Sequence, residues 1–153
     1  MMQKTPWNPS KRAILKVKNP LPPPTICNYC GSSVKISHHK EIYNGKSFGN
    51  WPWAYLCNCC GAYVGMHPFT NIPLGTLADA ETRNARKQCK PYFERLWKFN
   101  GAIFSRNDAY NWLANKLGIK TSECHFGWFD IDTCHRAKEI CENMIIKRGN
   151  YHD

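Results

Sequence analysis

Apolar and polar residues alternate with the two-residue period of β-strands in the first half of the chain. Val34 to Ser37 alternates in this way, and Trp53 to Leu56 and Tyr63 to Gly65 are two further short strand candidates. Asn44-Gly45, between the first two, is a dipeptide typical of hairpin turns. The pattern therefore predicts β-hairpins between residues 26 and about 66. An alternating piece closer to the N-terminus, residues 14–18, is expected as a short edge strand that Pro20 ends.

A helical period replaces the alternation after a loop at residues 68–77. Thr76 or Asp79 can cap a first helix, and Pro91 either kinks that helix or begins a second one. The apolar residues that follow Pro91 are expected to be buried; they are Tyr92, Phe93, Leu96 and Trp97.

Two further helices are predicted from their end signals. Ser105 resembles the first residue of a capping box and Gly118 suits the position just past a helix end. A final helix is expected to begin after Asp130 or Asp132. The segment at residues 108–119 also has the pattern of the first helix and turn of a helix-turn-helix, whose second helix would span residues 121–129. Gly127, followed by two large aromatics, suits groove reading poorly, so a compact helical bundle is the favoured interpretation.

Four of the nine cysteines form two copies of one unit, Cys27-x-x-Cys30-Gly and Cys57-x-x-Cys60-Gly. Two cysteines at this spacing can direct both sulfurs at one ion, and the glycine accepts the positive φ at the exit of the turn. Four thiolates complete a tetrahedral Zn²⁺ site, so we expect a structural zinc ribbon that does not hold its fold without zinc. Disulfides and a redox dithiol are competing interpretations, but neither explains the two matched units. An iron–sulfur cluster is a further, weaker alternative.

Cys59 is the ambiguous cysteine. It could replace Cys60 as a ligand, but the spacing from Cys57 would give a poorer turn, and Gly61 follows Cys60 as Gly31 follows Cys30. We therefore expect Cys60 to be the ligand.

These elements predict an α+β chain in which a small zinc ribbon of β-hairpins packs against a C-terminal bundle of three to four helices. The expected divisions are a basic, proline-rich extended arm at 1–25, the zinc ribbon at 26–68 and a helical region at 69–150. No apolar run is long enough to cross a bilayer and no signal-peptide pattern opens the chain. We expect a cytoplasmic protein.

The net charge of +10 is unevenly distributed. Residues 1–40 contain seven Lys or Arg and no acidic residue, since Glu41 is the first carboxylate. A basic segment ahead of a folded domain favours a polyanionic partner, although an excess of lysine can also serve solubility alone.

The sequence as a whole resembles a family. The stretches 27–31, 55–57, 60–67, 73–78, 91–97, 109–114, 117–119 and 123–130, taken in order, look like the zinc-finger-containing domain of unknown function found mainly in phages and their bacterial hosts. The likeness covers about residues 27–141 and implies a zinc ribbon followed by helices, a phage origin and no stated activity. The ribbon also resembles, more weakly, those of bacterial topoisomerases, which contact single-stranded DNA. Asn28 departs from the usual proline of the first unit.

Cations and flat rings are interleaved in the predicted ribbon, a combination suited to single-stranded nucleic acid. The alternative is that a ribbon with a thin core needs its aromatics for packing. The candidate nucleic-acid-binding residues are Lys11, Arg12, Lys16, Lys18, Lys35, Lys40, Lys46, Trp51 and Trp53.

Two other chemistries are weaker. His67, His125 and Cys134, with Cys124 and His135, could form a second metal site, but adjacent Cys124 and His125 cannot easily share one ion. A Cys124 nucleophile lacks an oxyanion device or an orienting carboxylate.

The leading hypothesis is a non-enzymatic phage protein that binds nucleic acid, with DNA favoured and single-stranded DNA as one candidate form, in transcription, replication or genome handling. The alternative is a module that captures a host protein such as RNA polymerase or a defence factor; a metal-dependent enzyme is a third interpretation.

Overall fold

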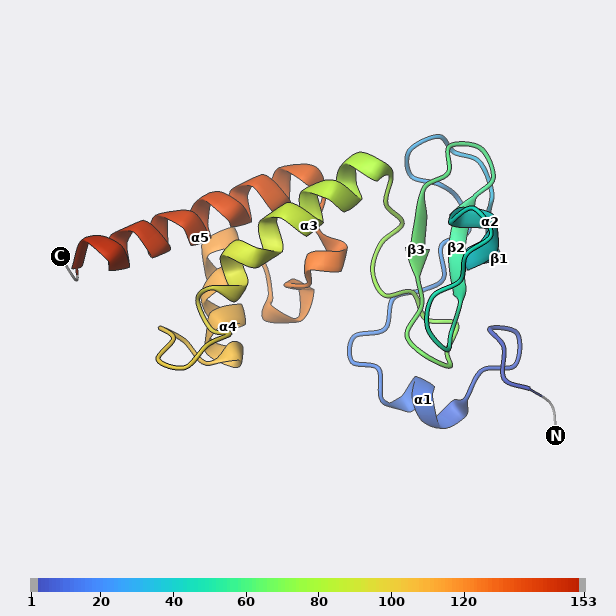
Figure 1. Cartoon of the computed structure of the whole chain (residues 1–153), viewed down its shortest axis with the longest axis horizontal. Helices are drawn as coiled ribbons and strands as arrows, with labels where there is room; N and C mark the ends of the chain where they lie inside the picture. Colours follow the sequence, from blue (N-terminus) through green and yellow to red (C-terminus); the bar gives the residue numbers. More distant parts are fainter. Residues whose placement is uncertain (1–2, 152–153) are drawn as a thin grey trace. The chain divides into compact units, whose positions relative to one another are not determined.

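The computed structural model describes residues 3–151, with side chains as far as Arg148. The chain divides into two compact units, Met1–Ala80 and Glu81–Asp153. The first unit contains the sheet and the second contains the long helices (Figure 1). This is the α+β fold that the sequence predicts, with a small antiparallel sheet followed by helices.

Three short strands form the sheet in the order β1-β2-β3, all antiparallel. They are β1 (Val34–His38), β2 (Trp53–Cys57) and β3 (Tyr63–Gly65), as predicted. Val34 pairs with Cys57 and His38 with Trp53, so the sheet has a cysteine end and a tryptophan end. Ile36, Tyr55 and Val64 share one face because the register places them opposite one another.

That face covers the core of the first unit. The residues buried in it are Cys27, Tyr55, Cys57, Ala62, Val64, Met66 and Leu77. The connection from β1 to β2 is longer than a tight hairpin, because the short helix α2 (His39–Ile42) precedes the turn. Asn44 and Gly45 do adopt the positive φ expected of a turn, at 54° and 83°.

The N-terminal segment contains a turn and a helix. Thr5 and Asn8 exchange two backbone hydrogen bonds, of 3.3 and 2.9 Å, around Pro6 and Trp7. The edge strand predicted at 14–18 is wrong: Ile14 and Leu15 end the short helix α1 (Lys11–Leu15), and residues 16–18 form neither helix nor strand. Ser10 is the reason, since its side chain accepts a hydrogen bond from the Ala13 N–H and caps the helix.

The second unit is built from α3 (Ala80–Glu94), α4 (Arg106–Leu117) and α5 (Ile131–Tyr151). Pro91 lies in the last turn of α3, where it does not open a separate helix. Phe93, Leu96 and Leu113 have no exposed surface at the centre of the core. Cys89, Cys124, Cys134 and Cys141 are buried in the same core, where thiols pack as small apolar groups.

The predicted ends of α4 and the predicted start of α5 are confirmed. The Ser105 hydroxyl accepts from the Asp108 N–H, and Gly118 ends α4 with φ 75°. Asp130 Oδ1 accepts from the Thr133 N–H at 2.7 Å at the start of α5. The prediction of a second helix of a helix-turn-helix at 121–129 is wrong, because this stretch forms two 3₁₀ turns, Thr121–Glu123 and Phe126–Trp128.

Candidate metal centre and nucleic-acid interface

Two matched turns bring four cysteines to one end of the sheet. The Cys27 N–H donates to the Ser32 carbonyl and the Cys57 N–H donates to the Ala62 carbonyl, both at 2.8 Å. Gly31 and Gly61, which follow the second cysteine of each turn, have positive φ angles of 77° and 79°. The repeated sequence unit therefore folds into a repeated local structure.

The four sulfurs of Cys27, Cys30, Cys57 and Cys60 all lie within 4.8 Å of one another. The Cys27–Cys60 and Cys30–Cys57 sulfur pairs are 3.6 and 3.4 Å apart. Sulfurs placed tetrahedrally at about 2.3 Å from Zn²⁺ would be separated by about 3.8 Å, so this donor set fits a zinc ion. A disulfide would need about 2.05 Å, and all nine cysteines are free thiols.

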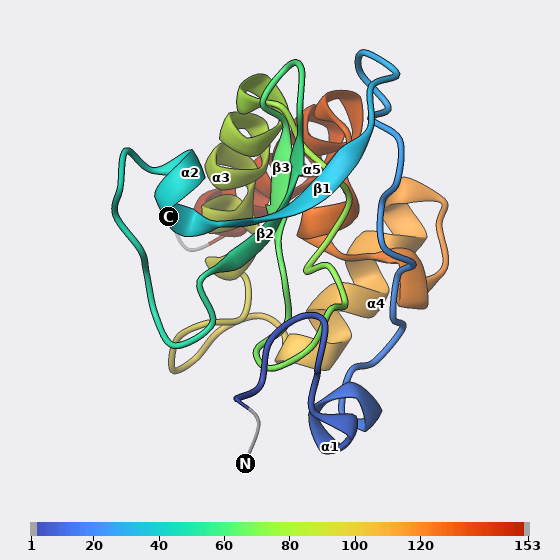
Figure 2. The same ribbon diagram turned by 90° about the vertical axis from the view of Figure 1, so that its right-hand side faces the viewer.

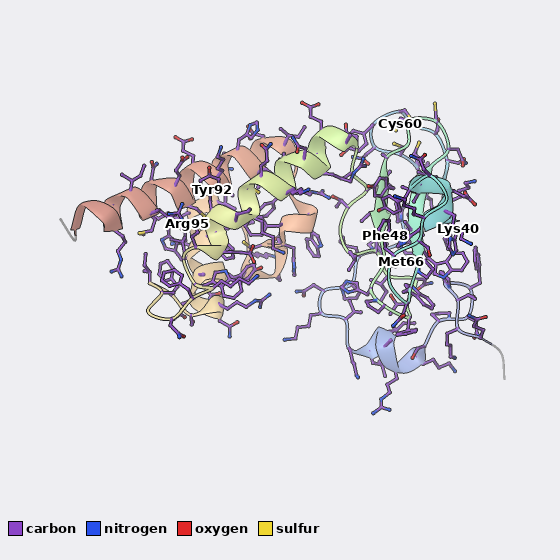
Figure 3. All side chains as sticks on the ribbon, in the orientation of Figure 1. Lys40, Phe48, Cys60, Met66, Tyr92 and Arg95 are labelled. Atoms are coloured by element: carbon purple, nitrogen blue, oxygen red, sulfur yellow. The ribbon has the colours of Figure 1, made fainter. Side chains whose placement is uncertain are left out.

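Cys60 belongs to this cluster and Cys59 does not. Figure 3 labels Cys60 in the loop between β2 and β3. The side chain of Cys59 is exposed, and only its backbone N–H approaches the cluster, at 3.4 Å from the Cys57 sulfur. The Cys60 N–H makes a similar approach to the same sulfur, at 3.5 Å.

Hydrogen bonds lower the thiol pKa of two of the four clustered cysteines, Cys30 and Cys57. The hydroxyl and then the backbone N–H of Ser32 lower the pKa of the Cys30 thiol to about 6. The backbone N–H groups of Cys60 and Cys59 lower the pKa of Cys57. At Cys60 a bond from the Ala62 N–H favours the thiolate, but burial and the neighbouring thiols outweigh it and raise the pKa to about 12. Four thiolates this close repel one another, so the fully ionised cluster needs a bound cation.

A family of zinc-finger-containing domains matches residues 23–144 of this sequence. The chain belongs to this family. No curated protein and no solved structure matches it. The matched residues of the zinc-finger-containing domain include the paired turns, the sheet and nearly all of the helical unit.

The candidate cations lie in several places on the first unit, some of them ahead of the residues that match the zinc-finger-containing domain. Lys11 and Arg12 are on α1 and exposed, with Lys16 and Lys18 just beyond it. Lys40 and Lys46 are exposed in and after α2. Lys35 is different because its ammonium group lies 3.3 Å from the Glu41 carboxylate.

The two candidate tryptophans are half-buried and pack against the core of the sheet. Trp51 donates its indole N–H to the Thr70 carbonyl at 3.0 Å. The ring of Trp53 meets the rings of Trp7 and His38 edge to face, with centroids 5.4 and 5.1 Å apart. These contacts match the packing interpretation of the two residues.

Two exposed aromatic residues of the first unit were not among the candidate nucleic-acid-binding residues. Trp7 is 66% exposed and Phe69 is 43% exposed. Trp7 stands between Pro6 and the Asn8-Pro9 pair, a turn signal that could have marked its exposed position. Pro68, directly before Phe69, is a turn signal of the same kind, and the Thr70 N–H donates to the His67 carbonyl at 3.1 Å to close that turn.

No second metal cluster lies within the described residues: His67, His125 and Cys134 join no group of three ligand side chains there. Cys124 and Cys134 are buried in the helical core. Burial raises the pKa of the Cys124 thiol to about 11, which disfavours its nucleophilic form. Among residues 3–151, no helix combines the length and hydrophobicity that a bilayer span needs.

Proposed function

We propose that Cys27, Cys30, Cys57 and Cys60 hold one structural Zn²⁺ ion, and that the unit it stabilises binds nucleic acid. The donor set supports zinc, since four thiolates fill a tetrahedral site and leave no position for a reactive water. In this proposal the protein is a binding module and not an enzyme. The expectation of a phage origin and of action in the host cytoplasm rests on the resemblance alone.

One contact carries the nucleic-acid part of the proposal. The Ser10 backbone N–H donates to the Phe69 carbonyl at 2.8 Å, at the start of α1. This bond ties the basic N-terminal segment to the loop that follows β3 (Figure 2). Lys11 and Arg12 are therefore held on a folded surface and not only on a flexible tail.

The charge of the first unit supports a polyanionic partner. Residues 1–80 contain eight Lys or Arg and only two acidic residues, Glu41 and Asp79. Glu41 is already paired with Lys35, and within residues 3–148 neither Lys11 nor Arg12 forms an ion pair. Cations without intramolecular partners can neutralise phosphates, and the released counterions drive binding.

Fluorescence anisotropy with labelled DNA at several salt concentrations tests this proposal. Affinity should fall steeply with salt, and Lys11→Ala/Arg12→Ala should lower the slope of log K against log salt by about 1.4 on single strands if each residue contacts one phosphate. Lys116→Ala/Lys120→Ala, which removes two exposed lysines of the second unit, is the matched control and should leave the slope unchanged. An affinity that does not depend on salt would refute the proposal.

A second candidate function, capture of a protein, is favoured by a groove in the helical unit. The groove has a volume of about 450 Å³, and Figure 3 labels Arg95, one of its residues. Its lining includes Arg95, Leu96, Phe99, Ile103, Ile145 and Arg148. Neither arginine forms an ion pair within residues 3–148, so the groove suits a peptide with an apolar anchor beside an acidic side chain.

Nuclease-treated affinity purification separates the two functions. A stoichiometric protein partner that survives nuclease and is lost with Phe99→Asp would favour protein capture through the groove. Phe99 is 59% exposed, so this change should not disturb folding. A partner retained by the variant would argue against the groove.

A further inference from the structure

Trp7 is presented by a rigid turn at the tryptophan end of the sheet. The reciprocal backbone bonds between Thr5 and Asn8 close the turn, and Pro6 within it is buried. The contact with Trp53 uses only part of the Trp7 ring, since 66% of the residue stays exposed. A large aromatic side chain is thus held in place while most of its surface faces solvent.

Phe69 is the second exposed ring, and the backbone that presents it is strained. Its φ is 63°, in the left-handed region that bulky side chains rarely adopt. Thr70, which has no exposed surface, stabilises the turn. Its hydroxyl donates to the His67 carbonyl at 2.8 Å and accepts from the Ile72 N–H at 3.0 Å. Strain of this kind at an exposed residue, supported by a buried polar side chain, is a feature of functional surfaces.

Both rings lie at the tryptophan end of the sheet, opposite the end that carries Cys57. The Phe69 ring packs against the Trp51 ring and the Trp7 ring against the Trp53 ring, with centroids 5.2 and 5.4 Å apart. The Phe69 carbonyl accepts the bond from Ser10, and the next two residues are the cations of α1. Single exposed apolar residues are ordinary, but two rings held by separate ordered turns beside unpaired cations form a built surface.

We infer that Trp7 and Phe69 are a stacking platform for unpaired bases, with Lys11 and Arg12 contacting the adjoining phosphates. This inference rests on the proposed nucleic-acid binding and specifies its substrate as single-stranded. Stacking needs the flat face of a base to be free, and a duplex leaves such faces only at its ends. The platform therefore prefers single strands to duplex and tolerates different base sequences.

The binding of labelled oligothymidylate and oligouridylate of about 15 nucleotides, compared with a duplex of the same length, tests the platform. Trp7→Ala and Phe69→Gly should each weaken single-strand binding by roughly 5- to 150-fold. Glycine is chosen at position 69 because it removes the ring and accepts the positive φ. Trp7→Phe keeps a ring and should retain most of the affinity, while duplex affinity should be the same in every variant.

Ile146→Ala is the matched control, because it removes an exposed large apolar side chain from the helical unit, outside the groove described above. Thermal unfolding of each variant shows that a loss of binding is not a loss of fold. If Trp7→Ala and Phe69→Gly bind like wild type while Lys11→Ala/Arg12→Ala weakens binding, the platform is refuted and the proposed function stands. Equal losses on single strands and duplex also refute the platform. If the wild type binds neither form at low salt, both proposals fail.

Discussion

Removal of zinc is expected to unfold the sheet unit while the helical unit stays folded. The core of the sheet unit is small, and two of its buried residues, Cys27 and Cys57, are themselves proposed ligands. Structural zinc contributes an apparent 10–16 kcal/mol at about pH 7. That term is of the same size as the roughly 5–15 kcal/mol by which whole domains are stable, so a sheet of three short strands should not persist without it.

The helical unit has a separate and larger core, in which Phe93, Leu96 and Leu113 are fully buried. None of the four clustered cysteines lies in that unit. Its stability therefore comes from apolar burial, at about 25 cal/mol per Å², and should not depend on the metal.

Hydrogen exchange measured by mass spectrometry, with and without a strong chelator, resolves the two units. Peptides that cover β1, β2 and β3 should lose their protection when zinc is removed, and peptides from α3, α4 and α5 should keep it. Elemental analysis must show about one zinc per chain before chelation and none afterwards. Protection of the three strands in metal-free protein would refute the reasoning.

Single substitutions sharpen the same test. Cys60→Ser should reduce bound zinc and release the strands, because it removes one of the four clustered sulfurs. Cys59→Ser is the matched control, since this neighbouring thiol is exposed and outside the cluster. Equal zinc loss in both variants would contradict the proposed ligand set.

Three further substitutions are expected to change stability by mechanisms that thermal or denaturant unfolding can separate. Phe93→Ala should destabilise the helical unit by about 3–5 kcal/mol, because it empties a fully buried site; a loss below about 1 kcal/mol would mean that the core is not packed as described. Gly61→Ala should cost about 1–2 kcal/mol in the zinc-bound protein from backbone strain alone, since a Cβ there meets no atom within 4 Å but φ is 79°. Asp130→Ala should lower the free energy of unfolding by about 1 kcal/mol, because it removes the cap of α5. Asp130→Asn should lose much less, because the amide oxygen can still accept the capping hydrogen bond. Hydrogen bonds from Thr133 lower the pKa of Asp130, so its stabilising effect is complete above pH about 4 and is lost as the pH falls through the folded-state pKa; Asp130→Asn should lack that acid-dependent loss.

Local features were predictable where neighbouring residues decide the structure. The matched cysteine turns are an example, because the spacing and the following glycine both act within five residues. The caps at Ser105 and Asp130 are another, since a side-chain oxygen binds a backbone N–H three residues away. The same rule at Ser10 was the competing signal that overturned the expected strand at 14–18.

The amino-acid sequence alone determined the four-cysteine unit, the three strands and the excess of positive charge near the N-terminus, because each depends on residue type and short-range spacing. Only the tertiary structure decided which aromatics are exposed. Trp51 and Trp53 look the same in sequence as surface rings, yet they pack against the core, while the distant turns of Trp7 and Phe69 leave those two side chains exposed. Exposure depends on what the rest of the chain places beside a ring, and a local pattern does not contain that information.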